Sequence, residues 1–536
     1  MKLKHAIFAV LSLAAIPAHA QLFGTNTGTF VDYLQSYGPD SVPLRYPGQF
    51  QQGFNPAPSG VVSGYAPVIT GNTGIYSNAA NYPNATGYTL QFNAPNPAAI
   101  SATINGMFKN LSNVQINGTQ YTATFTLQHD RGDLLAGGGE IDLAGASTSN
   151  PITNLAVIRP GGTLGGLTPS YQSYLNNYNA VRWMNNNNIN NNNGVVNASD
   201  LLPSGQNISN NGNSYTDIIN WSNQQANLQK VWVNIPTNAT NAFIKSVADQ
   251  FATQLNPGKQ VIFEYGNENW NFAFQHPGLV VLPKGQADPR VTAKDYTTVV
   301  AQESGLQSAN MMQIVKAEFT AKGADANRAQ GFLGSQGANQ YFVDQSKAAI
   351  TRVYGASAIT QLFKYQGISF YPADNLTSAG SVDQILSAVY SDLNRQTGYL
   401  AKDKADAAAS GLSEAIYEWS PNGYLTAGGV PAAVVNAFRN DPRAKKWTID
   451  EWNAIKSILG PNDMAMEFSI LGDGWSAQIN PLLAHEPEQQ AIDQISAGLS
   501  VGSGTPIVGG TLAPEPTCLS LMGLVATGLL ARRRKN

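Results

Sequence analysis

The chain has 536 residues, of which only 12% are charged, and its formal net charge is −3. Because this composition offers no basic stripe, we exclude nucleic acid as a partner. The many polar, uncharged residues, among them 51 glycines, instead suit a protein that works on carbohydrate or within an extracellular matrix.

The first residues have the pattern of a cleavable export signal. Lys2 and Lys4 precede an apolar stretch at residues 6–16, and Ala18-His19-Ala20 then supplies the small residues that a signal peptidase accepts. We therefore expect signal peptidase to remove residues 1–20 during export.

A small antiparallel β-sandwich is predicted in the next part of the chain. Tyr88, Leu90 and Phe92 alternate with polar residues and share one face of a strand, and residues 121–127 repeat this pattern. Turn-rich segments separate these runs. We assign residues 60–158 to the sandwich.

After Pro160 apolar strands alternate with polar loops and amphipathic helices, the order typical of a parallel (β/α)₈ barrel. The predicted fold class is thus α/β, a TIM barrel formed by residues 21–59 and 159–490 with the sandwich inserted after the first strand. The eight strands are expected near residues 21–24 and at residues 180–184, 230–235, 260–265, 330–333, 368–371, 415–418 and 464–470, with helices at residues 241–255, 296–322 and 381–396 between them.

The end of the predicted fourth strand is rich in polar and aromatic residues. Residues 261–271 read Val-Ile-Phe-Glu-Tyr-Gly-Asn-Glu-Asn-Trp-Asn, and barrels keep their catalytic groups at such strand ends. The two-residue period of a strand turns Glu264 and Glu268 toward the lumen, and Asn267 could hold a sugar hydroxyl. Alternatively, Glu268 begins a helix, where acidic residues are favoured.

A second carboxyl group stands at the end of the predicted seventh strand, where residues 415–420 read Ala-Ile-Tyr-Glu-Trp-Ser. Strands four and seven lie across the barrel mouth from one another. Glu268 and Glu418 could therefore flank a glycosidic bond, and a retaining glycosidase needs such a pair about 5 Å apart.

In this order, the residues resemble the large glycoside hydrolase clan whose barrels place an Asn-Glu pair after strand four and a nucleophilic Glu after strand seven. More closely, residues 230–236, Lys-Val-Trp-Val-Asn-Ile-Pro, together with the strand-four motif, resemble secreted bacterial hydrolase-like proteins associated with cellulose. The resemblance implies that Glu268 is the general acid/base, Asn267 the binder of the 2-hydroxyl and Glu418 the nucleophile. The five scattered histidines leave no metal cluster, and no cofactor is expected.

Two further residues match the clan's pattern. Arg182, at the end of strand two, corresponds to the arginine that steadies the nucleophile, and Tyr371, after strand six, could donate a hydrogen bond to Glu418. Alternatively, Arg182 is a surface residue or a structural partner of Glu264, and Tyr371 belongs to the core.

Four tryptophans near the predicted rim could offer flat faces to pyranose rings: Trp183, Trp270, Trp419 and Trp475. Tryptophans at strand ends also often serve only in packing. The chain departs from the clan beside the cleft, because Trp419-Ser420 stands where small glycines are expected and the loop at residues 185–193 is dominated by Asn. The substrate and the activity itself stay open at this point.

The last residues have the three-part order of a sorting tail. After a Gly-rich linker at residues 491–513, Pro514-Glu515-Pro516 precedes a short apolar run at residues 518–530 and a terminal Arg cluster. Residues 514–536 resemble the PEP-CTERM signal of Gram-negative bacteria, which implies transient anchoring in the inner membrane and removal by an exosortase. An ordinary transmembrane anchor is the alternative, although roughly 20 apolar residues are needed to span a bilayer.

Three other features carry no function. The single cysteine, Cys518, lies in the tail, so the exported chain has no disulfide. Ser500 sits in a Gly-x-Ser-x-Gly pattern, but no histidine follows it. Arg131-Gly132-Asp133 has the composition of an ordinary turn.

The sequence therefore predicts a secreted retaining glycoside hydrolase, sorted to the cell surface, that cleaves a β-linked polysaccharide by double displacement. The alternative is a non-catalytic carbohydrate-binding or extracellular-matrix protein built on a hydrolase-like barrel. The expected partners are the polysaccharide, signal peptidase and the exosortase.

Overall fold

The computed structural model describes residues 22–26, 68–77, 85–128, 139–184, 189–190, 194–205, 207–208, 212–470, 475–478 and 484–498. The predicted export signal, the sorting tail, Arg131-Gly132-Asp133, Ser500 and most of the Asn-rich loop lie outside these residues. Among the described helices, none is long and apolar enough to cross a membrane.

Nine parallel strand segments close into an eight-stranded barrel, which confirms the predicted fold class. The order runs β16-β15-β14-β13-β10-β1-β19-β18-β17, and pairing of β16 with β18 closes the ring. The segments are β1 (Leu22–Asn26), β10 (Ala180–Trp183), β13 (Lys230–Ile235), β14 (Gln260–Tyr265), β15 (Ala329–Gly334), β16 (Phe363–Gly367), β17 (Ser369–Phe370), β18 (Ser413–Trp419) and β19 (Met464–Glu467).

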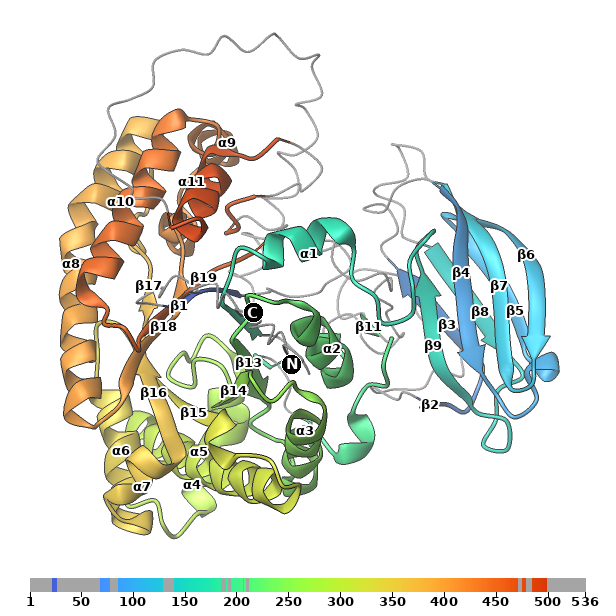
Figure 1. The fold of residues 1–536 in the computed structure, drawn as a ribbon, viewed down its shortest axis with the longest axis horizontal. Helices are drawn as coiled ribbons and strands as arrows, with labels where there is room; N and C mark the ends of the chain where they lie inside the picture. Colours follow the sequence, from blue (N-terminus) through green and yellow to red (C-terminus); the bar gives the residue numbers. More distant parts are fainter. Residues whose placement is uncertain are drawn as a thin grey trace, which may run out of the picture.

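Helices surround the barrel (Figure 1). They are α1 (Pro169–Leu175), α2 (Tyr215–Gln224), α3 (Asn241–Gln254), α4 (Leu282–Ala287), α5 (Tyr296–Ala321), α6 (Tyr341–Tyr354), α7 (Ser357–Leu362), α8 (Val382–Ala409), α9 (Ala432–Arg439), α10 (Pro442–Ile458) and α11 (Pro487–Ser496). Side chains of Thr240, Asp295 and Ser381 accept backbone N–H groups at the starts of α3, α5 and α8. These caps fix where each helix begins after its loop.

The barrel strands are buried on both faces, and alternate residues serve two cores. Trp232, Ile262 and Phe332 belong to a cluster in the lumen, whereas Val231 and Phe263 pack outward against the helices. This double burial explains why β13 and β14 read as continuous apolar runs and could be recognised from the sequence.

Three predicted elements differ from the structure. Strand six begins five residues earlier than expected, as β16, and is interrupted at Ile368 before β17. Strand eight ends at Glu467 instead of residue 470, and α8 continues to Ala409 instead of ending at residue 396. Short parallel strands that contain Gln, Gly and Glu lack the apolar signal that marks β13 and β14.

Two antiparallel sheets stand to one side of the barrel (Figure 1). Their orders are β2-β9-β4-β7-β6 and β3-β8-β5, and both contribute to one apolar core. The strands are β2 (Val68–Ile69), β3 (Thr73–Ser77), β4 (Ala85–Asn93), β5 (Ser101–Gly106), β6 (Phe108–Asn117), β7 (Gln120–Leu127), β8 (Gly139–Ala144) and β9 (Ile152–Ile158), with a hairpin of β11 (Asn207–Ile208) and β12 (Gly212–Asn213) later in the chain.

These sheets lie between β1 and β10 in the chain, as the insertion requires. Leu202, from the loop after β10, joins their core and ties the sandwich to the mouth of the barrel. The domain boundaries at residues 59, 158 and 490 stay predictions.

Candidate active site

A turn directly after β14 places Glu268. The strand ends at Tyr265, and the backbone then adopts positive φ at Gly266 (74°) and again at Glu268 (47°). A Cβ on Gly266 would meet the Asn269 Oδ1 atom at 2.2 Å, so only glycine fits there. Glu268 therefore neither continues the strand, as the two-residue period predicted, nor begins a helix.

A bulge in β18 places Glu418. Between Ile416 and Trp419 the register with β19 shifts, so that three steps along β18 oppose two along β19. Tyr417 belongs to the lumen cluster, whereas Ile416 and Trp419 pack in the outer core. A bulge lets two successive residues face the same side, and both Tyr417 and Glu418 thus reach the mouth of the barrel.

Arg182, at the end of β10, is the centre of the site and is fully buried. Its guanidinium donates to the Glu264 Oε2 atom at 2.9 Å, to the Glu418 Oε1 atom at 2.9 Å and to the Asn267 Oδ1 atom at 2.7 Å. A further N–H reaches the Asn26 Oδ1 atom at 3.0 Å. Burial disfavours the charge, but Glu264 and Glu418 outweigh it and raise the pKa of Arg182.

Glu264 lies beneath the mouth and is bound on both oxygens. Besides Arg182, the Trp232 Nε1–H group donates to its Oε2 atom at 2.9 Å. Burial raises its pKa, and Arg182 opposes that rise. These contacts agree with the alternative role, a structural partner of Arg182, and substrate binding by Glu264 stays a prediction.

Glu418 accepts hydrogen bonds on both of its oxygens. Arg182 contacts the Oε1 atom, and the Tyr371 hydroxyl, directly after β17, donates to the Oε2 atom at 2.7 Å. Burial, followed by the negative charge of Glu418, keeps the pKa of Tyr371 well above its ordinary value. Tyr371 therefore stays a donor at every pH of interest.

Glu268 has weaker support and a different charge state. The Tyr417 hydroxyl donates to its Oε1 atom at 3.1 Å and the Asn271 amide to its Oε2 atom at 2.8 Å. Burial of the carboxyl group, and then the charge of Glu418, raise the pKa of Glu268 to about 8. At neutral pH Glu268 thus holds a proton, whereas Glu418 beside it accepts from a guanidinium and a hydroxyl group.

Asn267 is buried between two protein partners. Its Oδ1 atom accepts from Arg182, and its Nδ2 atom donates to the Asn190 Oδ1 atom at 2.9 Å. An amide has two N–H donors, so one remains for a substrate hydroxyl. Its predicted role as the binder of the 2-hydroxyl stays a prediction.

The prediction that four tryptophans offer their faces to sugar rings is wrong for two of them. Trp183 and Trp419 are buried and face outward, where they pack on Trp221 and Trp452 with ring centroids 5.4 and 5.8 Å apart. Strand alternation explains this, because Trp183 follows Arg182 and Trp419 follows Glu418, and both of those preceding residues point inward. Such side chains can only pack against helices.

Trp270 and Trp475 are only partly buried and remain candidates for sugar contact. The Trp475 ring lies 5.5 Å from that of Tyr371, the partner of Glu418. The two indoles are therefore the predicted platforms that the structure leaves at the site.

The sequence prediction missed Tyr417, Asn271, Asn26 and Asn190. Tyr417 adjoins Glu418, and strict alternation assigned it to the opposite face. Asn271 was visible in the strand-four motif, and its position three residues after Glu268 within a turn was the available signal.

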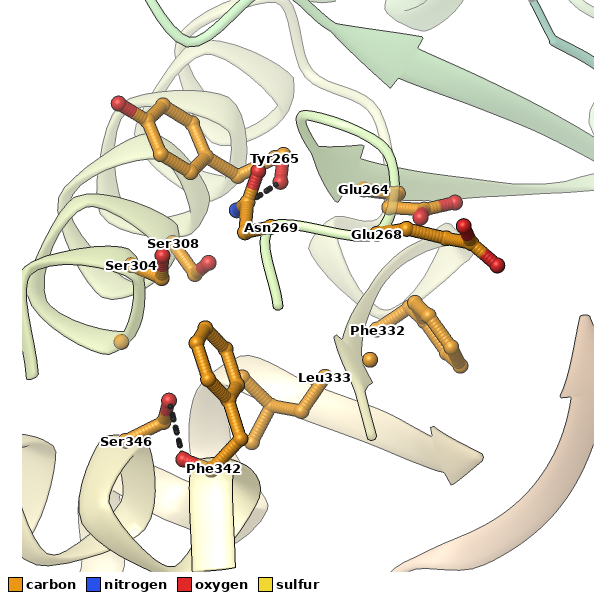
Figure 2. A pocket seen from close by; sticks show the side chains of 12 residues that line it. Glu264, Tyr265, Glu268, Asn269, Ser304, Ser308, Phe332, Leu333, Phe342 and Ser346 are labelled. Carbon is orange, nitrogen blue, oxygen red and sulfur yellow. Dashed lines mark hydrogen bonds between the residues drawn. The ribbon is translucent and has the colours of Figure 1, made fainter. Parts of the chain in front are cut away.

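A small cavity lies behind this site, between β14, β15, α5 and α6 (Figure 2). Its volume is about 20 Å³, room for about one water molecule. In Figure 2 the carboxyl groups of Glu264 and Glu268 point together and away from Ser304 and Ser308. The cavity is too small for a sugar and is not the substrate cleft. In the described part of the chain no group of three His, Cys, Asp or Glu residues could hold a metal.

No protein-family model and no curated protein matches this chain. Among solved structures, it is similar to a 4-O-α-L-rhamnosyl-β-D-glucuronidase of Fusarium oxysporum, with 14% identity and a TM-score of 0.37 over 61% of this chain and 64% of that one. A GH5-4 broad-specificity endoglucanase of Clostridium acetobutylicum shares 10% identity, with a TM-score of 0.32 over 61% of this chain and 89% of its own.

A GH113 β-1,4-mannanase shares 10% identity, with a TM-score of 0.24 over 53% of this chain and 91% of its own. The alignment to the fungal glucuronidase leaves out about a third of that protein. These similarities are distant, and they assign neither an activity nor a substrate to this chain.

Proposed function

We propose that the protein is a retaining glycoside hydrolase that cleaves a β-linked polysaccharide with Glu268 as general acid/base and Glu418 as nucleophile. The observation that carries this proposal is that the two carboxyl groups have different surroundings. Glu418 accepts from Arg182 and Tyr371, whereas burial and the charge of Glu418 raise the pKa of Glu268 to about 8. One group is thus ready to attack and the other to donate a proton.

In the first step the Glu418 carboxylate attacks the anomeric carbon. The bond from that carbon to the glycosidic oxygen breaks, and Glu268 transfers its proton to this oxygen, so that the leaving sugar departs as an alcohol. The Glu418 oxygen and the anomeric carbon now form a glycosyl ester. Arg182 keeps its hydrogen bonds to Glu264 and Asn267 during this step.

In the second step the ionised Glu268 takes a proton from water, and the water oxygen attacks the anomeric carbon. The ester bond breaks, the sugar leaves with a new hydroxyl, and Glu418 is a carboxylate again. Formation of the ester removes the charge of Glu418, one of the two causes of the raised pKa of Glu268. The pKa of Glu268 therefore falls, and Glu268 stays ionised and can serve as the base.

Two observations support a neutral sugar polymer as substrate. Trp270 and Trp475 are only partly buried beside the carboxyl pair, and the chain has few charged residues. We further propose, from the terminal sequences, that the protein is exported by a Gram-negative bacterium, anchored briefly in the inner membrane and released to the cell surface by an exosortase.

Release of reducing ends from a polysaccharide panel tests the proposal. Wild-type protein is expected to hydrolyse at least one β-linked polymer, and Glu268→Gln is expected to lower kcat by about 10²–10⁴-fold. Glu451→Gln is a matched control, since Glu451 is a fully buried acid in α10, away from the mouth. Binding without hydrolysis by the wild type would instead identify a non-catalytic carbohydrate-binding protein.

A further inference from the structure

Exposed aromatic side chains gather in one place on the described surface. Four aromatic residues are markedly exposed among the described residues: Phe272 (41%), Tyr296 (44%), Tyr341 (46%) and Tyr390 (39%). The first three lie in the loop after β14 and at the first residues of α5 and α6. Isolated exposed aromatics need no explanation, but a cluster marks a binding surface.

This cluster lies on the catalytic face of the barrel. Helices in a (β/α)₈ barrel run opposite to the strands, so the helix that follows each strand begins near that strand's carboxyl end. Tyr296 and Tyr341 are the first residues of the helices after β14 and β15. They are therefore at the same end of the barrel as Glu268.

Contacts hold the three rings in place. The rings of Phe272 and Tyr296 are 4.7 Å apart at an angle of 60°. The Tyr341 hydroxyl lies 2.7 Å from the Thr298 Oγ1 atom, which in turn donates to Asp295, the residue that caps α5. Little freedom would be lost when a ligand binds to rings that are already fixed.

One hydrogen bond connects the cluster to the catalytic acid. Asn271 donates to the Glu268 Oε2 atom at 2.8 Å, and Phe272 is the next residue, with its Cα atom about 3.8 Å further along the chain. Since a general acid gives its proton to the leaving-group oxygen, the loop that carries it lies on the leaving-group side of the cleaved bond.

We propose that Phe272, Tyr296 and Tyr341 form a binding site for pyranose units on the leaving-group side of the substrate. This inference rests on the proposed hydrolase function. The C–H faces of a sugar ring are apolar and pack on aromatic rings, while its hydroxyls remain in water or bond to tyrosine hydroxyls. The three rings themselves carry no charge, which suits neutral sugars.

Hydrolysis of two substrates tests the site. A β-linked hexasaccharide (cellohexaose, mannohexaose or xylohexaose, whichever is cleaved) places sugars in the site, whereas the corresponding nitrophenyl glycoside places none there. The ratio of kcat/KM for the hexasaccharide to that for the nitrophenyl glycoside is expected to fall about tenfold in Phe272→Ala, the effect of one well-packed aromatic contact. An unchanged ratio would overturn the site.

Tyr390→Ala is the matched control. Tyr390 is comparably exposed but lies within α8, where its hydroxyl bonds to Asp450. It should leave the ratio as in the wild type. Tyr341→Phe keeps the ring and should retain most of the ratio, whereas Tyr341→Ala should lose it; equal thermal midpoints would show that each variant is folded.

Binding separates this inference from the proposed function. Calorimetric titration of the three hexasaccharides into the wild type and Phe272→Ala requires no turnover. If the wild type binds without hydrolysing and Phe272→Ala binds about tenfold more weakly, the sugar site stands and the hydrolase function fails. If the wild type binds none of them, or if Phe272→Ala binds equally well, the sugar site is wrong.

Discussion

Two of the regions that hold buried carboxyl groups are the mouth of the barrel and the space between β19, α10 and α11. At the mouth, Glu264 and Glu418 share Arg182, and each is bound on both oxygens. In the second region Tyr178, at 2.6 Å, and Thr25 both donate to the Oε2 atom of Glu467.

The second region resembles the first in its pKa values. Burial raises the pKa of Glu467 to about 8 and that of Glu488 to about 7, and it raises that of Glu451 well above the ordinary range. All three side chains are fully buried. At neutral pH Glu451 and Glu467 are thus mainly protonated acids enclosed by protein, and Glu488 is close to its midpoint.

The two regions differ in how exposed their acids are and in the groups that lie beside those acids. Glu268 is only partly buried and faces Glu418, whose carboxylate is held by Arg182 and Tyr371. Glu467 has no exposed surface, and the carboxyl group whose charge it senses, Glu488, itself has a pKa raised to about 7. A raised pKa alone therefore does not mark a catalytic carboxyl group. It does so when substrate can reach that group and a second carboxyl group, bound by a cation, lies beside it.

Replacement of Glu418 should have the largest effect. Glu418→Gln removes the nucleophile and is expected to lower kcat at least about a thousandfold. Glu451→Gln should leave kcat unchanged, although it alters an equally buried carboxyl group. Rates on the polysaccharide that the wild type cleaves compare the two, and full activity of Glu418→Gln would sink the assignment of the mouth as the active site.

Loss of the shared cation should follow in size. Arg182→Gln leaves Glu264 and Glu418 buried without a positive charge, which is expected to cost about 3–5 kcal/mol of unfolding free energy. Urea denaturation measures this. Because the cost comes from uncompensated charge, the double variant Arg182→Gln/Glu264→Gln should recover part of it, and a double variant less stable than Arg182→Gln would contradict this account.

The pH dependence of kcat/KM should reveal Glu268. The general acid must be protonated, and burial followed by the charge of Glu418 raises its pKa to about 8. Activity should therefore be present below about pH 8 and fall as the pH rises through that value. In Tyr417→Phe a donor to the carboxylate is lost, so the pKa of Glu268 should rise further, by about one unit. A basic limb that moves downward, or not at all, would remove Tyr417 from this role.

The smallest effect on activity is expected in the second region. Burial raises the pKa of Glu467 from 4.5 to about 8, so the folded protein holds this proton more tightly than the unfolded chain does. Its contribution to stability is full below about pH 4.5 and is lost as the pH rises toward 8. Glu467→Gln should flatten the fall of the thermal midpoint over this range with little change in kcat; an unaltered slope would mean that Glu467 is ionised in the fold.

The sequence was sufficient to predict a strand and the site residues at its end where that strand is buried on both faces and ends in a polar motif. β13 and β14 have the predicted bounds, and Glu268, Glu418, Arg182 and Tyr371 meet at one end of the barrel. Continuous apolar runs define such strands, and the barrel then brings their ends together.

Local irregularities could not be predicted. The bulge that turns Tyr417 inward depends on the pairing of β18 with β19, which no residue in 415–420 encodes alone. The outward burial of Trp419, by contrast, follows from ordinary alternation after Glu418. The positive φ at Glu268 depends on Gly266 and its close approach to Asn269. The strand period therefore predicted the correct end of the barrel for Glu268 but the wrong backbone conformation, a strand instead of a turn.

Trapping the glycosyl ester tests the central claim most directly. A 2-deoxy-2-fluoro glycoside with a reactive leaving group, matched to the sugar that the wild type cleaves, slows the second step more than the first and lets the ester accumulate. Peptide mass spectrometry should then find one fluorosugar on Glu418, and none in Glu418→Gln. Turnover of the same sugar with the label on another residue, or with inverted configuration and no label at all, would contradict the account.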